Sequence, residues 1–479
     1  MGDRVPTFAA AVEVGRPSVT AELLVKFFVL LWGMKFLTLL VAAAFCTTPV
    51  FADESVQGLA ESELPSLLAI YKDLHQHPEL STREQRTSEL VAKELRAAGC
   101  EVTDHIGKYK NAGETGYGVV GLMKNGDGPV VLVRTDMDAL PVQEETGLPY
   151  ASKVTTTNNA GEEVHVMHAC GHDVHISTFI GVAREMAKLK DQWHGTIVFV
   201  GQPAEELGTG ARALLNDGLY NRFPKPDYAL GFHDNAQMEI GHVGVTPGYT
   251  YANVDSVDVT VHGLGGHGAY PHKTKDPIVL SAEMINMWQT IPSRQINPID
   301  PVVVTVGSIH GGTKHNIIPD EVRMQLTVRT YKGEVRRQVL DAIKEVARGC
   351  AIAGGWPQDK MPEVKVREDE FTPSTYNNPE LTQRLIGVWK KSLGEKNVEI
   401  VDPTMGGEDF SEYSLADHSI PAVDFHVGAV SPEKIAASKK EAATPLPSLH
   451  SSKFAPVPEP TIKTGVIAMT SAVLDLMKK

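Results

Sequence analysis

Val130-Val-Leu-Val-Arg-Thr-Asp-Met-Asp138 is the stretch that decides the fold class. Its apolar start predicts a short strand at 130–134, which two carboxylates follow directly. Turn residues at 125–128 separate this strand from another apolar run at 118–123, and this pattern predicts a β-hairpin between the two runs. In open α/β sheets, functional sites form at the carboxyl ends of strands, so the carboxylates are candidates. Taken alone, a solvated acidic pair on a loop is the simpler interpretation.

Strands and helices alternate on both sides of this stretch. Apolar runs at 196–200 and 227–232 follow helical stretches around 173–190 and 209–217. Such alternation predicts an α/β fold, in which helices flank a mixed sheet. No internal repeat is found.

A second pattern begins near residue 251. Residues 254–261 alternate between apolar and polar side chains, as a half-exposed strand does. Two helices and several alternating strands predict a small α+β domain at 251–362, after which the α/β pattern resumes. We therefore expect a discontinuous larger domain, 53–250 with 363–479, which carries the smaller domain as an insertion.

Charge and the N-terminus bear on partners and location. The net charge of −14 argues against a nucleic-acid-binding surface, which needs a basic stripe. Met34-Lys35, the apolar run 36–45 and a small-residue site ending at Ala52 predict a signal peptide within 1–52, with residues 1–33 as an upstream extension from a misplaced start codon. This predicts a periplasmic or secreted protein that keeps no membrane span after signal removal. The alternative is a membrane anchor, since 23–32 is also apolar, but lysines interrupt that span.

Four cysteines are too few for a disulfide framework in a chain of this length. Cys46 would leave with the signal peptide. Cys100 and Cys350 would either pair or remain free thiols, and free thiols are the favoured interpretation. Cys170 belongs to a different pattern.

His168-Ala-Cys-Gly-His-Asp-Val-His175 concentrates metal-ligand types within eight residues. Thiolate and imidazole are the usual ligands of zinc and similar ions, and Gly171 allows a turn on which Cys170 and His172 converge. Asp173 is expected to accept the second imidazole N–H of a ligating histidine. The alternative, a polar turn opening a helix, is less favoured because such a density of ligand types is uncommon by chance.

Three further features are weak when taken singly. Glu205 and Glu206 follow the strand at 196–200, where one carboxylate would bind metal and the other would carry a proton. His233 follows an apolar strand, and His450 lies in a loop. Each of these residues taken alone is equally well explained without any function. The prediction of a metal site therefore depends on all of them falling at strand ends or loops of one α/β layer.

One motif is set aside. Gly263-Leu-Gly-Gly-His-Gly268 formally matches a dinucleotide-binding fingerprint. Pro271 stands where the phosphate-binding helix should begin, and no second strand follows at the required distance. An NAD-dependent oxidoreductase is therefore disfavoured.

Six motifs in order together resemble the M20 metallopeptidase family, and most closely its amidohydrolase branch, across roughly residues 60–479. They are Arg134-Thr-Asp-Met-Asp-Ala-Leu-Pro141, Met167-His-Ala-Cys-Gly-His-Asp173, Gln202-Pro-Ala-Glu-Glu206, Gly265-Gly-His-Gly-Ala-Tyr-Pro-His272, Asn316-Ile-Ile-Pro-Asp320 and Gly407-Glu-Asp-Phe410. The branch includes hippurate hydrolases, N-acyl-amino-acid amidohydrolases and auxin-conjugate hydrolases.

The resemblance implies a catalytic domain that holds two divalent metal ions (Zn, Mn, Ni or Co) and an inserted lid domain that often dimerises. Residues that fall on the family's metal ligands are Cys170, His172, Glu206, His233 and His450. Residues that fall on other site positions are Glu205 as general base, Asp138 as an orienting carboxylate, His267 as an oxyanion-stabilising histidine, and Asn316 and Arg329 as substrate contacts.

The resulting expectation is hydrolysis of the amide bond of an N-acyl amino acid by a homodimer or higher homo-oligomer. A dipeptidase or carboxypeptidase with the same site is the first alternative. An inactive periplasmic binding protein is the alternative from another class, and the intact Glu205-Glu206 pair argues against it.

Overall fold

The computed structural model describes residues 55–110, 116–158, 160–440 and 444–479. The predicted signal peptide and upstream extension lie outside these residues. Among the described residues, no helix combines the length and the apolar character that crossing a membrane requires. Cys100, Cys170 and Cys350 are free thiols, as expected.

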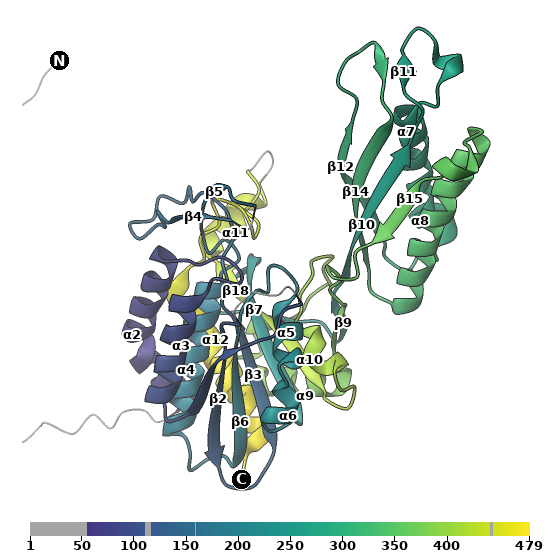
Figure 1. The fold of residues 1–479 in the computed structure, drawn as a ribbon. Helices are drawn as coiled ribbons and strands as arrows, with labels where there is room; N and C mark the ends of the chain where they lie inside the picture. Colours follow the sequence, from purple (N-terminus) through teal and green to yellow (C-terminus); the bar gives the residue numbers. More distant parts are fainter. Residues whose placement is uncertain (1–54, 111–115, 159, 441–443) are drawn as a thin grey trace, which may run out of the picture. The chain divides into compact units, whose positions relative to one another are not determined.

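An eight-stranded mixed sheet forms the centre of the larger α/β region (Figure 1). Its order is β1-β2-β6-β3-β7-β18-β8-β17. The strands are β1 (Glu101–Ile106), β2 (Gly118–Asn125), β3 (Val130–Asp136), β6 (Gly195–Gln202), β7 (Tyr228–Glu239), β8 (Val243–Val245), β17 (Val398–Ile400) and β18 (Ala422–Val430).

The hairpin expected between β2 and β3 is wrong. Strand β6 lies between them, antiparallel to β2 and parallel to β3, and β3 also runs parallel to β7. Turn residues specify where the chain reverses but not which strand becomes the neighbour. The apolar strand β3 is buried along almost all of its length, and this favours a central place with parallel neighbours on both sides.

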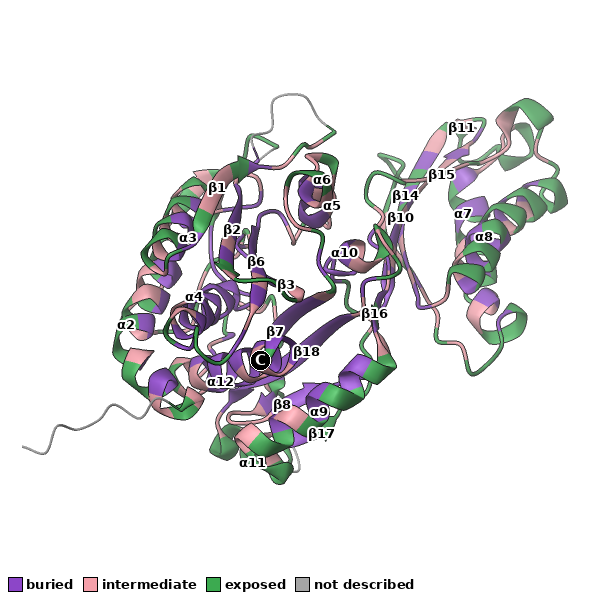
Figure 2. Cartoon of the chain, turned by 90° about the horizontal axis from the view of Figure 1, so that it is seen from below, coloured by how far each residue is buried: buried purple, intermediate pink, exposed green. Residues whose placement is uncertain are grey.

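Helices cover both faces of this sheet, which confirms the predicted α/β class. One apolar cluster joins the sheet to α2 (Val56–Gln76), α3 (Gln85–Ala97), α4 (His172–Lys188), α9 (Pro379–Leu393) and α12 (Pro458–Met477). A second cluster joins the sheet to α5 (Gly210–Asn216), α6 (Leu219–Arg222) and α10 (Ser411–Leu415). Figure 2 shows buried residues along the strands and on the helix sides that face them.

A four-stranded antiparallel sheet with order β12-β14-β10-β15 has its own apolar cluster. Its strands are β10 (Asn253–His262), β12 (Val303–Gly311), β14 (Glu321–Thr330) and β15 (Glu363–Val366), and its helices are α7 (Pro277–Trp288) and α8 (Gly333–Ala353). Along β10 the side chains alternate strictly between buried and half-buried, as its sequence predicts. Strand β15 lies beyond residue 362 and still pairs with β10, so this sheet extends past the expected boundary.

Short elements complete the described chain. The strands are β4 (Thr155–Thr157), β5 (Glu163–His165), β9 (Gly248–Tyr251), β11 (Gly266–His267), β13 (Ile317–Ile318) and β16 (Thr375–Asn377). The remaining described helices are the α-helix α11 (Pro432–Ser438), the short 3₁₀ helices η1 (Pro271–Lys273), η3 (Gln358–Lys360) and η4 (Glu395–Asn397), and the π-helical η2 (Ile291–Gln295).

Candidate metal centre

The turn before α4 presents Cys170 and His172 side by side. Gly171 is the N-cap of α4 and has φ +80°, a left-handed conformation that glycine adopts without strain. A Cβ at this position would lie 2.4 Å from Asp234 Oδ2, which is closer than a real contact allows. Glycine is therefore required here both by the backbone conformation and by the lack of space.

Five predicted ligands converge on this turn. The Cys170 thiol lies 3.4 Å from His233 Nε2 and 3.3 Å from His450 Nε2. Glu206 Oε2 is 3.4 Å from His450 Nε2, and Glu206 Oε1 is 3.9 Å from His172 Nε2. Strand β7 carries His233, and the backbone N–H of His450 donates to the carbonyl of Ala169, which ties its loop to the turn.

The donor set suits two divalent cations. One group of close ligand atoms comes from Cys170, His172 and His233, and another from Cys170, Glu206 and His450, so the thiol is common to both. His172 Nε2 and Glu206 Oε1 are buried and have no hydrogen-bond partner among the described residues. Buried polar atoms are normally satisfied, and a bound cation would satisfy these two.

Burial raises the pKa of the Cys170 thiol well above its usual range, and the nearby carboxylates Glu206 and Glu205 raise it further. The thiolate is the form that binds metal, so a cation must compensate for the unfavourable surroundings. The need for a compensating positive charge fits a Cys170 thiolate that belongs to the ligand groups of both cations.

Backbone carbonyls orient two of the imidazoles. His172 Nδ1 lies 2.7 Å from the Asp138 carbonyl, and His233 Nδ1 lies 2.7 Å from the Asp234 carbonyl. Because a carbonyl oxygen only accepts, each Nδ1 donates, and each neutral ring then turns its Nε2 lone pair toward the thiol.

Asp173 does not orient a ligating histidine, so that expectation is wrong. Its carboxylate lies 2.6 Å from His75 Nδ1 on α2, and Glu144 faces the other nitrogen of the same ring at 3.1 Å. Successive side chains of an α-helix point about 100° apart, so Asp173 faces His75 of α2 while His172, one residue earlier, faces the other proposed ligands.

The Asp138 carboxylate holds the loop that carries both glutamates. It accepts from the backbone N–H groups of Glu205 at 3.1 Å and Glu206 at 3.0 Å, and from Ser81 Oγ at 2.5 Å. Ala204, just before the pair, has φ +51°. The orienting role expected for Asp138 therefore has a physical form: it positions the loop through its backbone.

Glu205 lies beside the ligands in a strongly acidic environment. Its Oε2 is 3.8 Å from His172 Nε2. Burial raises the pKa of Glu205 well above its usual range, and the carboxylates of Glu408 and Glu206 add to the rise. A carboxyl group whose pKa is raised in this way binds a proton more readily than an exposed one, as a proton-transferring group must during part of a cycle.

Three predicted residues come from the four-stranded sheet region. Arg329 lines a cavity of about 600 Å³ together with Glu205, Glu206 and His450. His267 and Asn316 lie next to one another at the paired strands β11 and β13, where the Gly268 N–H donates to the Asn316 carbonyl. Neither of these two residues lines that cavity.

Several residues that surround the proposed ligands received no specific role from the sequence, although Asp136 was a candidate as one of the two carboxylates after the 130–134 strand. Asp136 Oδ1 lies 2.7 Å from His175 Nδ1 at the end of β3. The buried Arg134 guanidinium contacts Asp136 at 2.8 Å and Glu408 at 2.9 Å. Asp136, His175 and Glu408 all lie within recognised motifs, but their partners depend on the packing of β3 against α4 and the 407–410 loop.

Comparisons with known proteins agree with this geometry. Residues 132–451 match the family model of peptidase family M20/M25/M40. The chain is 36% identical over 406 residues to thermostable carboxypeptidase 1 of Saccharolobus solfataricus, covering 84% of this chain and 93% of that protein. It is 36% identical over 343 residues to hippurate hydrolase of Campylobacter jejuni, covering 71% and 83%.

The structural comparison points the same way. A dinuclear metal-binding peptidase of the M20 family from Bacillus subtilis aligns with a TM-score of 0.66 and 28% identity, covering 87% of this chain and all of that one. The fold, the converging ligands and these matches together show that the chain belongs to the M20/M25/M40 peptidase family.

Proposed function

We propose that this protein is a metal-dependent amidohydrolase that cleaves the amide bond of N-acyl amino acids. The observation that carries the proposal is the cavity that contains Glu205, Glu206, His450 and Arg329. It combines a proton carrier, metal ligands and a cation for a carboxylate. The named activity of the hippurate hydrolase relative supports this substrate class.

Cys170, His172, Glu206, His233 and His450 would hold two divalent cations, which Zn, Mn, Ni or Co would suit. When bound, such ions supply Lewis acidity to water and to the amide carbonyl. Glu205 takes the proton of the attacking water and delivers it to the leaving amine, so one carboxylate serves both steps. Its raised pKa suits the second step, in which it must act as an acid.

Arg329 is assigned to the carboxylate of the amino-acid part. Among the described residues it forms no ion pair with an acidic side chain, and its Nη1 contacts only the Met405 carbonyl, at 3.5 Å. Burial lowers the pKa of Arg329, so a substrate carboxylate would stabilise its charge. A guanidinium fork matches that group in geometry.

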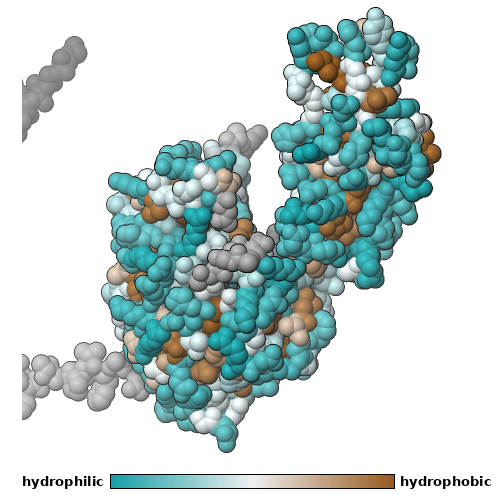
Figure 3. All heavy atoms as spheres, viewed as in Figure 1, coloured by the Kyte–Doolittle hydropathy of each residue, from teal (hydrophilic) through white to brown (hydrophobic). Residues whose placement is uncertain are grey.

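His267 and Asn316 are assigned to a second copy of the chain, in which they would reach the cavity and stabilise the developing oxyanion. Around them, several large apolar side chains are exposed: Leu264, Tyr270, Ile278, Val279, Met287, Ile309 and Ile317. Figure 3 shows apolar residues among the polar surface of this part of the chain. Strand β12 is an edge of its sheet, and a second copy pairing there would form a homodimer.

A periplasmic or secreted location is proposed from the sequence at 34–52. Its basic start, apolar run and small-residue site support export of the chain.

The decisive experiment is turnover by Glu205→Gln enzyme reconstituted with metal. We expect metal content to stay at the wild-type level while kcat falls by roughly 10³-fold or more, because the amide cannot accept the water's proton. Glu380→Gln, which removes an exposed carboxylate from the first turn of α9, serves as the matched control and should leave kcat unchanged. Wild-type turnover by Glu205→Gln would refute the assigned role.

A substrate panel separates the main proposal from its alternative. Carboxypeptidase activity is favoured by the 36% identity to thermostable carboxypeptidase 1. Hippurate, N-acetyl amino acids and dipeptides should be assayed side by side on metal-loaded enzyme. A higher kcat/KM for dipeptides than for every N-acyl amino acid would replace the amidohydrolase assignment with the peptidase one.

A further inference from the structure

A second cavity, of about 710 Å³, lies where the connections to the four-stranded sheet leave the larger sheet. We call it the hinge groove. Its lining comes from the 249–253 segment, the 331–337 segment at the start of α8, the 371–378 segment and the 414–422 segment. None of the proposed metal ligands lines it. Its volume is in the range of small-molecule sites.

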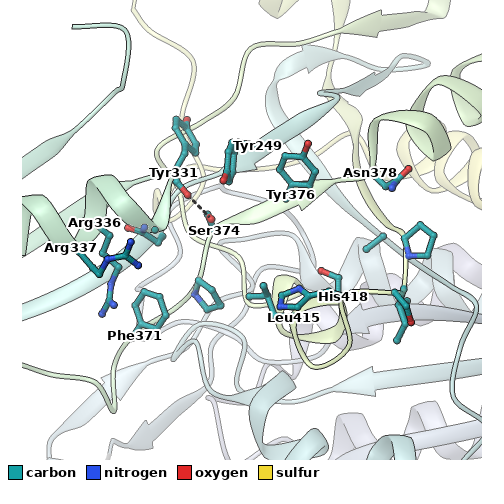
Figure 4. Close-up of a pocket in the computed structure, with 18 residues that line it drawn as sticks. Tyr249, Tyr331, Arg336, Arg337, Phe371, Ser374, Tyr376, Asn378, Leu415 and His418 are labelled. Carbon is teal, nitrogen blue, oxygen red and sulfur yellow. Dashed lines mark hydrogen bonds between the residues drawn. The ribbon is translucent and has the colours of Figure 1, made fainter. Parts of the chain in front are cut away.

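Aromatic rings form one side of the hinge groove (Figure 4). Tyr249 packs on Tyr331 with ring centroids 5.8 Å apart and against Tyr376 at 5.0 Å. Phe371 and Leu415 lie on the opposite side of the view. Two walls of this kind offer a planar apolar group contact on both of its faces.

Hydrogen bonds hold these walls in place. The Tyr331 hydroxyl donates to the Thr404 carbonyl at 2.9 Å, and Ser374 Oγ donates to the Tyr331 carbonyl at 2.8 Å. The Arg212 guanidinium donates to the Phe371 carbonyl at 2.6 Å. The groove is therefore built from anchored segments, and a ligand would not have to order them.

Two arginines of α8 lie at one end of the groove. Only Arg336 forms an ion pair with a described residue. Arg336 stacks over Phe371 with 4.0 Å to the ring centroid and pairs with Asp255 at 2.6 Å. Arg337 forms no hydrogen bond or ion pair with any described residue and is exposed. Gly333, in the first turn of α8, lines the same end, and no side chain caps this helix. A free guanidinium next to a helix N-terminus favours an anion.

The hinge groove is separate from the metal-centre cavity because neighbouring residues face opposite ways. Asn253 lines the groove and Val254 lines the cavity, while Phe371 and Pro373 line the groove and Thr372 lines the cavity. This is the side-chain alternation of extended backbone. A ligand in the groove would therefore contact the reverse side of the segments that bound the metal centre.

We propose that the hinge groove is a second binding site, which takes an aromatic monocarboxylate. The ring lies between the tyrosines and Phe371 with Leu415, and the carboxylate pairs with Arg337. Neither group of this ligand needs a metal ion, so binding here is independent of the proposed hydrolysis.

Calorimetric titration of the metal-loaded protein with phenylacetate tests the proposal. We expect binding to wild type and at least tenfold weaker binding to Arg337→Gln, which should fold normally because Arg337 is exposed. The matched control is Arg348→Gln, which removes an exposed arginine farther along the same helix and should bind as wild type does. Phenylacetamide, which keeps the ring and lacks the charge, should also bind at least tenfold more weakly than phenylacetate.

Arg329→Gln distinguishes the two cavities, because Arg329 lines only the metal-centre cavity. Phenylacetate should bind this variant as it binds wild type. Binding that is lost in Arg329→Gln but kept in Arg337→Gln would place the ligand at the metal centre and overturn the proposal. Absence of binding to wild type at millimolar phenylacetate would overturn it as well.

Discussion

At the scale of single residues, the metal centre depends on positions that are not themselves ligands. Gly171 gives the turn its left-handed conformation, and the Asp138 and Asp234 carbonyls set the direction of two imidazoles. The Asp138 carboxylate acts on the opposite side of the site, where it accepts both backbone N–H groups of the glutamate pair. Asp138 thus orients the proposed ligand His172 through its carbonyl and the proposed proton carrier Glu205 through its side chain.

Asp138→Asn tests this double role. The amide offers one acceptor and one donor where two N–H donors converge, so one of the loop's hydrogen bonds is lost and its N–H is left facing another donor. We expect a fall in kcat of at least tenfold in a folded protein, measured by steady-state kinetics together with metal content. Ser81→Ala, which removes the third hydrogen bond and keeps both loop contacts, should reduce kcat less. Equal kcat in Asp138→Asn and wild type would contradict the positioning role.

At the scale of elements, α4 connects the metal centre to the core. Its first turn carries His172, and it packs against β3, α2 and α12. Almost all of its residues are buried, including a glutamate near its end, Glu185, whose exposed fraction is 0%. Burial raises the pKa of Glu185 to about 8. Because other elements enclose α4 on several sides, the position of its first turn is fixed. The same enclosure buries the Glu185 carboxyl group in the core.

The Glu185 pKa predicts how stability depends on pH. The folded-state value of about 8 lies above the ordinary 4.5, so the folded state binds the proton more tightly. The proton is bound in both states below about pH 4.5, and stability then falls as the pH rises toward about 8. We expect Glu185→Gln to raise Tm by several degrees at pH 8.5 and to change it little at pH 4.5. Thermal unfolding at both pH values measures this.

Glu345→Gln is the control for the Glu185 prediction, because it removes an exposed glutamate from α8. It should give no such pH-dependent gain. A Tm for Glu185→Gln that matches wild type at both pH values would show that Glu185 does not destabilise the folded state.

At the scale of the whole molecule, the site is assembled from segments far apart in sequence. The end of β3, the start of α4, the loop after β6, the middle of β7 and the loop before α12 meet at one edge of the large sheet. Carboxylates outnumber cationic groups in these segments. The single guanidinium of Arg134, for example, contacts three carboxylates, those of Asp136, Glu408 and Asp409. A bound metal ion would therefore contribute to stability as well as to chemistry in this metal-dependent hydrolase.

Removing the metal should lower Tm together with activity. Metal binds only the folded arrangement of ligands, so at a free concentration of 100 times Kd it contributes about 2.7 kcal/mol. We expect a chelator to decrease Tm and abolish turnover, and we expect added metal to restore both. Calorimetry measures Tm, an activity assay measures turnover, and elemental analysis measures the metal content. His172→Ala should show a smaller chelator-dependent change in Tm than wild type. Full activity in protein verified as metal-free would contradict the two-metal assignment.

The proposed dimer makes a separate prediction at this scale. Val279→Glu places a charge among the exposed apolar side chains of α7 and should shift the protein from dimer to monomer in sedimentation velocity. Ile400→Glu, at an exposed apolar position on β17, should leave the assembly unchanged. A wild-type chain that sediments as a monomer would contradict the dimer.

The sequence alone determined the fold class and the ligand types, because both depend on local information. Alternation of strands and helices is a local periodicity, and Cys170, His172 and the glutamate pair are identified by spacing within single motifs. The resemblance across six motifs then suggested which separate residues belong to one site.

Tertiary structure alone decided which groups meet. Local turn signals could not tell that β6 lies between β2 and β3, because strand order is set by burial across the whole sheet. Nor could spacing tell that Asp173 faces His75 while the Asp138 carbonyl faces His172, because helix direction decides both contacts. The hinge groove depends most on tertiary structure. Its walls come from four separate segments, and only the packing of the described residues shows that Arg337 has no ion-pair partner among them.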